Sequence, residues 1–192
     1  MKKILAFFTF IISSTSVFSQ NGAGLFGAVN FSTSTINDAK TRVGGSIGML
    51  YDVNVSQRLF VQPRLVLSYQ ENETMVHPVG LSTFYSQWNA CLPVLASLRL
   101  IPADGLSVCV NFGPYGQFAV FGRDKRPTNN GEALGWWHED LGDRLSFGVQ
   151  GGITAEYRKW FAVFDYKYSL TKNKLNMNGH EKTFSLGIGH RF

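Results

Sequence analysis

Apolar and polar residues alternate along most of the chain with a period of two, which is the spacing of a half-buried β-strand and not of an amphipathic helix. The last segment shows the pattern most clearly, because its apolar residues share one face and its small or polar residues the other: Phe184, Leu186, Ile188 and Phe192 against Ser185, Gly187, Gly189 and Arg191. Similar alternation elsewhere predicts eight strands, at residues 22–32, 41–53, 58–70, 84–100, 105–122, 144–157, 159–170 and 182–192.

The predicted connections alternate in length. Those at 54–57, at 101–104 and around Arg158 are short, whereas those at 33–40, 71–83, 123–143 and 171–181 are long and polar. Tight turns at one end and long loops at the other are typical of bacterial outer-membrane barrels, in which the turns are periplasmic and the loops external. An even number of strands then leaves both chain termini on the periplasmic side.

The first residues resemble a secretory signal peptide and are set apart from the fold. Lys2 and Lys3 precede a short apolar run at 4–12, and Val17 and Ser19 suit the −3 and −1 positions of a cleavage site. The run is far shorter than the roughly 20 residues of a membrane-spanning helix. We therefore expect a signal peptide at 1–19 and one barrel domain at 20–192.

Alternation does not by itself say which face of a barrel is inside. The polar face carries charges of both signs, which can pair in a narrow interior where an isolated charge would be costly, and it is rich in Gly and Ser. The chain also ends on Phe192, at the close of an alternating strand. We therefore predict an all-β, eight-stranded, antiparallel up-and-down transmembrane barrel with its apolar face toward lipid. A soluble, lipocalin-like carrier with an apolar cavity is the alternative.

An eight-stranded barrel is just wide enough to be filled by its own side chains, so we expect a polar, filled interior and no open channel. The charged residues on the inward face are predicted to form a structural network: Asp52, Arg64, Arg99, Glu156, Asp165, Lys167 and Arg191.

Charge and composition exclude some classes of function. The formal net charge of +5 falls to +3 when cleavage removes Lys2 and Lys3, and no Lys/Arg run in the remaining chain resembles a nucleic-acid patch. We therefore expect no nucleic-acid partner.

Cys91 and Cys109 both fall on the inward face of neighbouring strands. Pairing these strands around Ala103 offsets the two residues by roughly 20 Å, whereas a disulfide requires Cα atoms within about 7 Å. We expect two free thiols in the interior, for which the sequence suggests no role.

Several segments together resemble the PorT-like family of outer-membrane barrels, found mainly in Bacteroidetes-type bacteria. They are 24–32 (GLFGAVNFS), 59–69 (LFVQPRLVLSY), 92–96 (LPVLA), 111–115 (NFGPY), 161–170 (FAVFDYKYSL) and 184–192 (FSLGIGHRF). The Gly-Pro-Tyr and Leu-Pro steps are the most specific. This resemblance implies the barrel fold and an outer-membrane location. The namesake is linked to protein secretion by the type IX system.

Catalysis receives little support from the sequence. His77, His138 and His180 fall in separate predicted loops, and His138 is followed by two carboxylates, but adjacent loop residues seldom share a productive geometry. No serine lies in a recognisable nucleophile motif, and no His or carboxylate pair has the spacing of metal ligands. We expect no catalytic residue, cofactor or metal. A lipid A- or lipid-modifying enzyme is the alternative, and it would need a Ser or carboxylate beside a His at the outer rim.

The predicted loop 123–143 is the most distinctive one. Trp136 and Trp137 add apolar mass to a mixed-charge segment, so that these residues and His138 either fold over the rim or contact a partner. The leading hypothesis is an integral outer-membrane protein with a non-enzymatic structural, adhesive or secretion-accessory role carried by external loops. Its expected partners are outer-membrane lipid and lipopolysaccharide, the barrel assembly machinery, and a secretion-system or surface partner.

Overall fold

The computed structural model describes residues 22–35, 41–76, 81–103, 106–128, 131–136, 144–171 and 180–192. Ten strands occur in this part of the chain: β1 (Ala23–Ser34), β2 (Arg42–Tyr51), β3 (Val53–Asn54), β4 (Leu59–Val76), β5 (Leu81–Ala103), β6 (Leu106–Thr128), β7 (Gly131–Trp136), β8 (Leu145–Tyr157), β9 (Trp160–Ser169) and β10 (Glu181–Arg191). The expected signal peptide, residues 1–19, lies outside the described residues.

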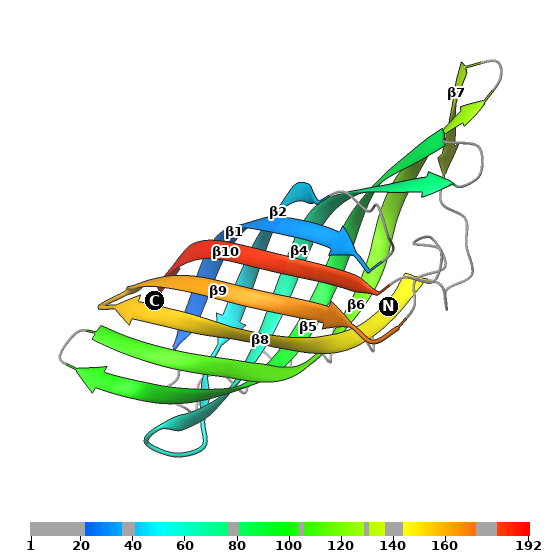
Figure 1. Ribbon diagram of the computed structural model, residues 1–192. Coiled ribbons are helices and arrows are strands. Elements are labelled where there is room, and N and C mark those ends of the chain that lie inside the picture. Colours follow the sequence, from blue (N-terminus) through cyan, green and yellow to red (C-terminus); the bar gives the residue numbers. More distant parts are fainter. Residues whose placement is uncertain are drawn as a thin grey trace, which may run out of the picture.

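The strands form one closed antiparallel barrel (Figure 1). Neighbours along the chain pair with one another, and β1 closes the ring by pairing with β10 from Gly24↔Arg191 to Ser34↔Glu181. β3 continues β2 past Asp52, and β7 pairs with β6 outside the ring, so eight of the ten strands make up the wall. The predicted fold class is confirmed.

The polar face points inward, as expected. Inward side chains are almost inaccessible, with Gln62 at 1% and Arg64 at 2% exposed, while Ile47 and Ile188 on the other face are 65% and 68% exposed. This belt of apolar side chains surrounds the barrel, as hydrocarbon contact requires. The soluble carrier, which needs the opposite arrangement, is wrong.

Aromatic rings gather at two levels of the outer face. At the end of the barrel that carries Gly22 and Phe192, here called the terminal end, His190 lies between Trp160 and Phe192, with ring centroids 5.0 and 5.7 Å away. Toward the opposite end, here called the loop end, Trp88 lies 5.3 Å from Tyr69 and 6.0 Å from Phe121. Both levels correspond to the aromatic girdles of membrane barrels.

Large side chains fill the interior where the wall carries glycine. A Cβ on Gly48 would lie 2.7 Å from the Phe26 ring, and a Cβ on Gly189 would overlap the ring of Phe161. Because these glycines leave room, Phe26 and Phe161 lie edge to face inside the barrel, 6.4 Å apart. They belong to an interior apolar cluster with Leu50, Val66, Cys91, Tyr115 and Val163.

Two predicted loops are largely strand instead. β4 and β5 remain paired from Gln70↔Gln87 to Val76↔Leu81, within the predicted loop 71–83. The predicted loop 123–143 contains the hairpin of β6 and β7, paired from Arg123↔Trp136 to Thr128↔Gly131. The error has a physical reason: strand pairing uses backbone N–H and C=O groups, so a strand can continue past the apolar belt without alternating side chains.

The two cysteines are buried and free. Cys91 pairs with Gln117 and Cys109 with Arg99, which separates them by eight positions along β5. Their predicted separation is therefore confirmed, although the turn lies between Ala103 and Leu106 and not around Ala103, which makes the actual offset larger than the six positions expected.

Candidate functional site

A chain of polar contacts runs through the terminal half of the interior. Arg191 contacts Glu156 (Nε–Oε1, 3.0 Å) and donates to Asp52 (Nη1–Oδ2, 2.5 Å). Gln62 donates to the second oxygen of Asp52 over 2.6 Å and accepts from Arg64 Nε over 2.7 Å. The predicted charges alternate in sign along this chain.

The last link crosses the barrel. Arg64 Nη1 lies 2.6 Å from Asp165 Oδ2, and both side chains are almost fully buried. Arg64 comes from β4 and Asp165 from β9, which lie on opposite sides of the ring. The Arg64 guanidinium also lies 5.9 Å from the ring centroid of Phe26. This pair therefore ties two facing walls together through the centre of the interior.

The other two predicted members lie against aromatic rings. Lys167 lies 5.8 Å from the ring centroid of Tyr115, and the Arg99 guanidinium 5.5 Å from that of Phe60. Neither makes an ion pair with a residue that the structure describes. Arg99 instead lines a polar mouth of about 460 Å³ at the terminal end, together with Asp52, Glu156 and Arg191.

Uncharged polar side chains make two further sets of contacts. Toward the loop end, Gln70 donates to Ser32 over 3.0 Å and accepts from Asn89 over 2.8 Å. Along the wall of β5, β6 and β8, Ser97 donates to Asn111 over 2.5 Å and Asn111 donates to Thr154 over 2.7 Å. These residues share the inward positions of the charged ones.

Glu181 was missed by the sequence analysis. It is buried and accepts a hydrogen bond from Thr183 over 3.2 Å. Glu181 falls in the predicted loop 171–181, but it begins β10. It is an even number of residues from Arg191, so both side chains point to the same face of the strand, and this spacing could have identified Glu181 as an interior residue.

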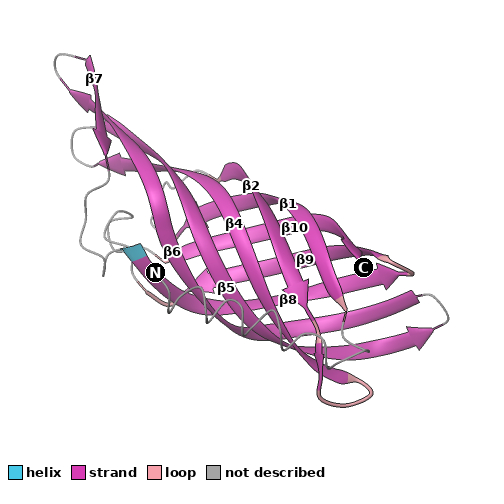
Figure 2. Ribbon diagram, turned by 180° about the vertical axis from the view of Figure 1, so that it is seen from behind, coloured by secondary structure: helices cyan, strands magenta, loops and turns pink. Residues whose placement is uncertain are grey.

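A second candidate site is the sheet that extends beyond the barrel at the loop end (Figures 1 and 2). The β2–β4 pairing ends at Gly45↔Tyr69, and β8 begins opposite Phe118. Past these points β4 continues to Val76 and β6 to Thr128, paired with β5 and β7, whereas β2 reaches only Arg42 and β1 only Ser34. Trp136 ends β7 opposite Arg123. Trp137 and His138, predicted to contact a partner with it, lie outside the described residues.

A Ser–His pair does come together near the loop end, but not in a catalytic arrangement. The ring of His180 stacks on Tyr168 at 5.5 Å, and its Nδ1 lies 2.9 Å from the backbone oxygen of Ser169. The Ser169 hydroxyl donates to the backbone oxygen of Thr171 over 2.8 Å. No hydrogen bond joins this hydroxyl to the imidazole in the part of the chain that the structure describes.

The described residues contain no group of three or more His, Cys, Asp or Glu side chains placed to hold a metal ion. Within the same residues, no helix is long and apolar enough to span a membrane.

An eight-stranded ring with apolar side chains outside and paired charges inside defines a transmembrane β-barrel of the small outer-membrane class. The sequence agrees: residues 18–174 match the family described as outer membrane protein beta-barrel domain, and the chain belongs to this family. The family and the similar structures below point to the bacterial outer membrane. A comparison with curated protein sequences finds no match.

Three solved structures illustrate the likeness in fold. A major outer membrane protein from Thermus thermophilus has a TM-score of 0.54 at 12% identity, covering 88% of this chain and 99% of the other. Ail, the attachment invasion locus protein of Yersinia pestis, has 0.53 at 13% identity, covering 90% and 99%. The outer membrane enzyme PagL has 0.50 at 10% identity, covering 86% and 98%. At these identities the likeness shows the fold alone.

Proposed function

We propose that this protein is a non-enzymatic outer-membrane barrel whose extended sheet recognises a partner outside the cell. The observation that carries the proposal is the length of its central strands. β5 and β6 have 23 residues each, whereas about 9–11 tilted residues cross the bilayer. β9 and β10, with 10 and 11 residues, have only the length needed to cross.

The topology supports recognition through this sheet. Beyond Tyr69, β4 pairs with β5 on one side and with no described strand on the other, and β7 pairs only with β6 among the described residues. An open strand edge presents unpaired backbone N–H and C=O groups, to which an extended segment of another protein can add as a strand. Trp136 ends β7, and recognition of the partner by Trp136, Trp137 and His138 is part of the proposal.

The orientation of the barrel is part of the proposal. The two-residue turn at Arg158 and Lys159 and both ends of the described chain lie at the terminal end. Short turns face the periplasm in this class of barrel, so the terminal end is assigned to the periplasm and the extended sheet to the exterior. A signal peptide at 1–19 fits this route.

The resemblance to the PorT-like family bears on the kind of partner. It favours a component of a secretion system over a host surface, whereas the likeness in fold to the attachment invasion locus protein is too distant to favour attachment. When the sheet is shortened, a secretion role predicts a loss of secreted proteins, and an adhesive role predicts a loss of attachment.

The test shortens the β6–β7 hairpin. Replacing residues 125–134 by Asn-Gly leaves Asp124↔Gly135 as the outermost pair, closed by a two-residue turn, and the barrel wall intact. The variant should reach the outer membrane at the normal level and migrate faster unboiled than boiled in electrophoresis, as a closed barrel does. Loss of proteins from the culture medium would support a secretion role, and loss of attachment to surfaces an adhesive one.

Wild-type behaviour in both assays, at equal outer-membrane level, would contradict recognition by this sheet. Release of acyl chains from lipid A by the purified folded protein would contradict the non-enzymatic role.

A further inference from the structure

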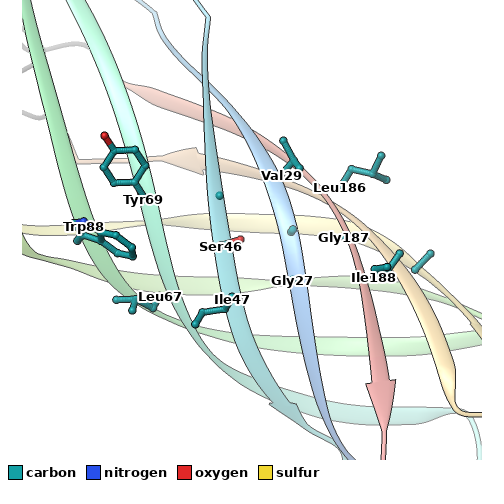
Figure 3. A pocket seen from close by; sticks show the side chains of 13 residues that line it. Gly27, Val29, Ser46, Ile47, Leu67, Tyr69, Trp88, Leu186, Gly187 and Ile188 are labelled. Carbon is teal, nitrogen blue, oxygen red and sulfur yellow. The ribbon is translucent and has the colours of Figure 1, made fainter.

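A groove interrupts the apolar outer face over β1 and β2. It has a volume of about 840 Å³, and a second hollow of about 590 Å³ adjoins it toward the terminal end, sharing Gly27, Ile47, Leu67 and Ile188. We name the two together the outer groove. In Figure 3, Gly27 lies between Ile188 on one side and Ile47 and Leu67 on the other.

Two glycines create the groove. Gly27 pairs with Ile47 and Ile188, and Gly45 pairs with Val29 and Tyr69, so each interrupts a row of large outward side chains. A Cβ on Gly27 would meet nothing nearer than the Ser46 backbone oxygen at 3.9 Å. A Cβ on Gly45 would meet only the Ala28 backbone oxygen at the same distance. Neither has a positive φ, so neither conformation nor crowding requires glycine.

Other glycines on the outer face are covered. The Phe147 ring lies 3.5 Å from a Cβ placed on Gly116, and the Phe112 ring 3.4 Å from one on Gly151. Aromatic side chains thus fill these gaps from the neighbouring strand. Glycine weakens a strand by about 0.5–1 kcal/mol relative to alanine, and at Gly27 and Gly45 no ring of a described residue takes up the space.

The chemistry of the groove selects an apolar occupant. Its walls are Val29, Leu186 and Ile188 on one side and Ile47 and Leu67 on the other. Ser46, a hydroxyl residue of the floor, already donates to Asn30 over 3.2 Å. The Tyr69 hydroxyl donates to Glu71 over 2.7 Å. The floor therefore offers a polar ligand few hydrogen-bonding groups, and each hollow has the volume of a small-molecule site, about 300–1,000 Å³.

We propose that the outer groove binds one acyl chain of a membrane lipid as an ordered ligand. The groove lies in the belt that faces hydrocarbon, between the Tyr69–Trp88 rings and the Trp160–His190 rings, so acyl chains surround it. A second copy of the barrel fits less well. Its wall is convex, so it would touch the rims at Ile47 and Ile188 and leave the floor empty, far from the roughly 1,000 Å² that a stable interface buries.

The proposal does not rest on recognition by the extended sheet, and its test changes only the groove. The Gly27→Leu/Gly45→Leu variant fills it, and Ala96→Leu adds the same kind of side chain to the outer face of β5, where its partners Val61 and Phe112 line neither hollow. Each protein is reconstituted in phosphatidylethanolamine–phosphatidylglycerol vesicles and extracted in mild detergent. Native mass spectrometry then gives the number of retained lipids, and migration of unboiled samples verifies folding.

We expect the wild-type chain and Ala96→Leu to retain one lipid at detergent concentrations that strip the Gly27→Leu/Gly45→Leu variant, with all three folded. Equal retention in all three, or none in the wild type, would overturn the proposal. A wild-type dimer that the filled variant loses would assign the groove to a second copy instead. If the double variant fails to fold, Gly27→Leu alone makes the same comparison.

Discussion

The Arg64–Asp165 pair is the interior contact whose disruption is expected to cost the most stability. Its atoms lie 2.6 Å apart and its side chains are 1% and 7% exposed. At that distance the attraction is about 6 kcal/mol for an effective dielectric constant of 20. Desolvation of both charges offsets most of it, but removing one partner strands the other, at a cost of about 3–5 kcal/mol.

The perturbation is a double-mutant cycle. Asp165→Asn leaves the Arg64 guanidinium buried with only Gln62 and the Phe26 ring beside it. Arg64→Met leaves the Asp165 carboxylate without its partner from the facing wall. With a urea slope of about 2 kcal/mol per molar, a loss of about 3–5 kcal/mol lowers the unfolding midpoint by roughly 1.5–2.5 M.

The double variant is expected to recover most of this loss, because it contains no uncompensated charge at either position. A coupling energy of at least about 2 kcal/mol should result, within the range for residues in contact. The assay is urea unfolding in lipid vesicles, followed by tryptophan fluorescence and by electrophoretic mobility.

Arg99→Met is the matched control. Arg99 lies over the Phe60 ring without an ion pair to a described residue, so its loss should cost only about 0.5–2 kcal/mol. Single variants at positions 64 and 165 with wild-type midpoints, or effects that simply add in the double variant, would refute the view that this pair holds the facing walls together.

Three further predictions follow from the packing. Gly113→Ala should lower the unfolding midpoint sharply, because the added Cβ would overlap the backbone oxygen of Val94. Gly27→Ala should leave the midpoint unchanged, because the space above Gly27 is open. Equal midpoints for the two variants would mean that β5 and β6 can move apart at little cost. Ile153→Arg, on the outer face at 48% exposure, should cost about 2–4 kcal/mol in vesicles, and a cost near zero would place this position outside the hydrocarbon. Cys91 and Cys109 are 0% and 3% exposed, so both thiols should resist a maleimide in the folded barrel and react after boiling in detergent. An internal disulfide on a non-reducing gel would contradict the register of β5 and β6.

The alternation of apolar and polar residues determined most of the barrel wall. A strand points successive side chains to opposite faces, so eight alternating segments separated by turns already specify eight strands and which residues share a face. The charges of both signs at Asp52, Arg64 and Asp165 then indicated that the shared polar face is inside. The separation of Cys91 from Cys109 followed from the same counting, because register in a hairpin is fixed by its turn.

Only the tertiary structure decided which residues meet across the interior. Arg64 and Asp165 are about a hundred positions apart and become partners because ring closure places β4 opposite β9. Gln62 links that pair to Asp52, a role that its place on the polar face could not reveal. The extended sheet also escaped prediction, because β6 and β7 pair through backbone groups that any sequence carries and need not alternate to remain paired. The outer groove likewise depends on register, since Gly27 and Gly45 leave a gap only where large side chains flank them on the neighbouring strands.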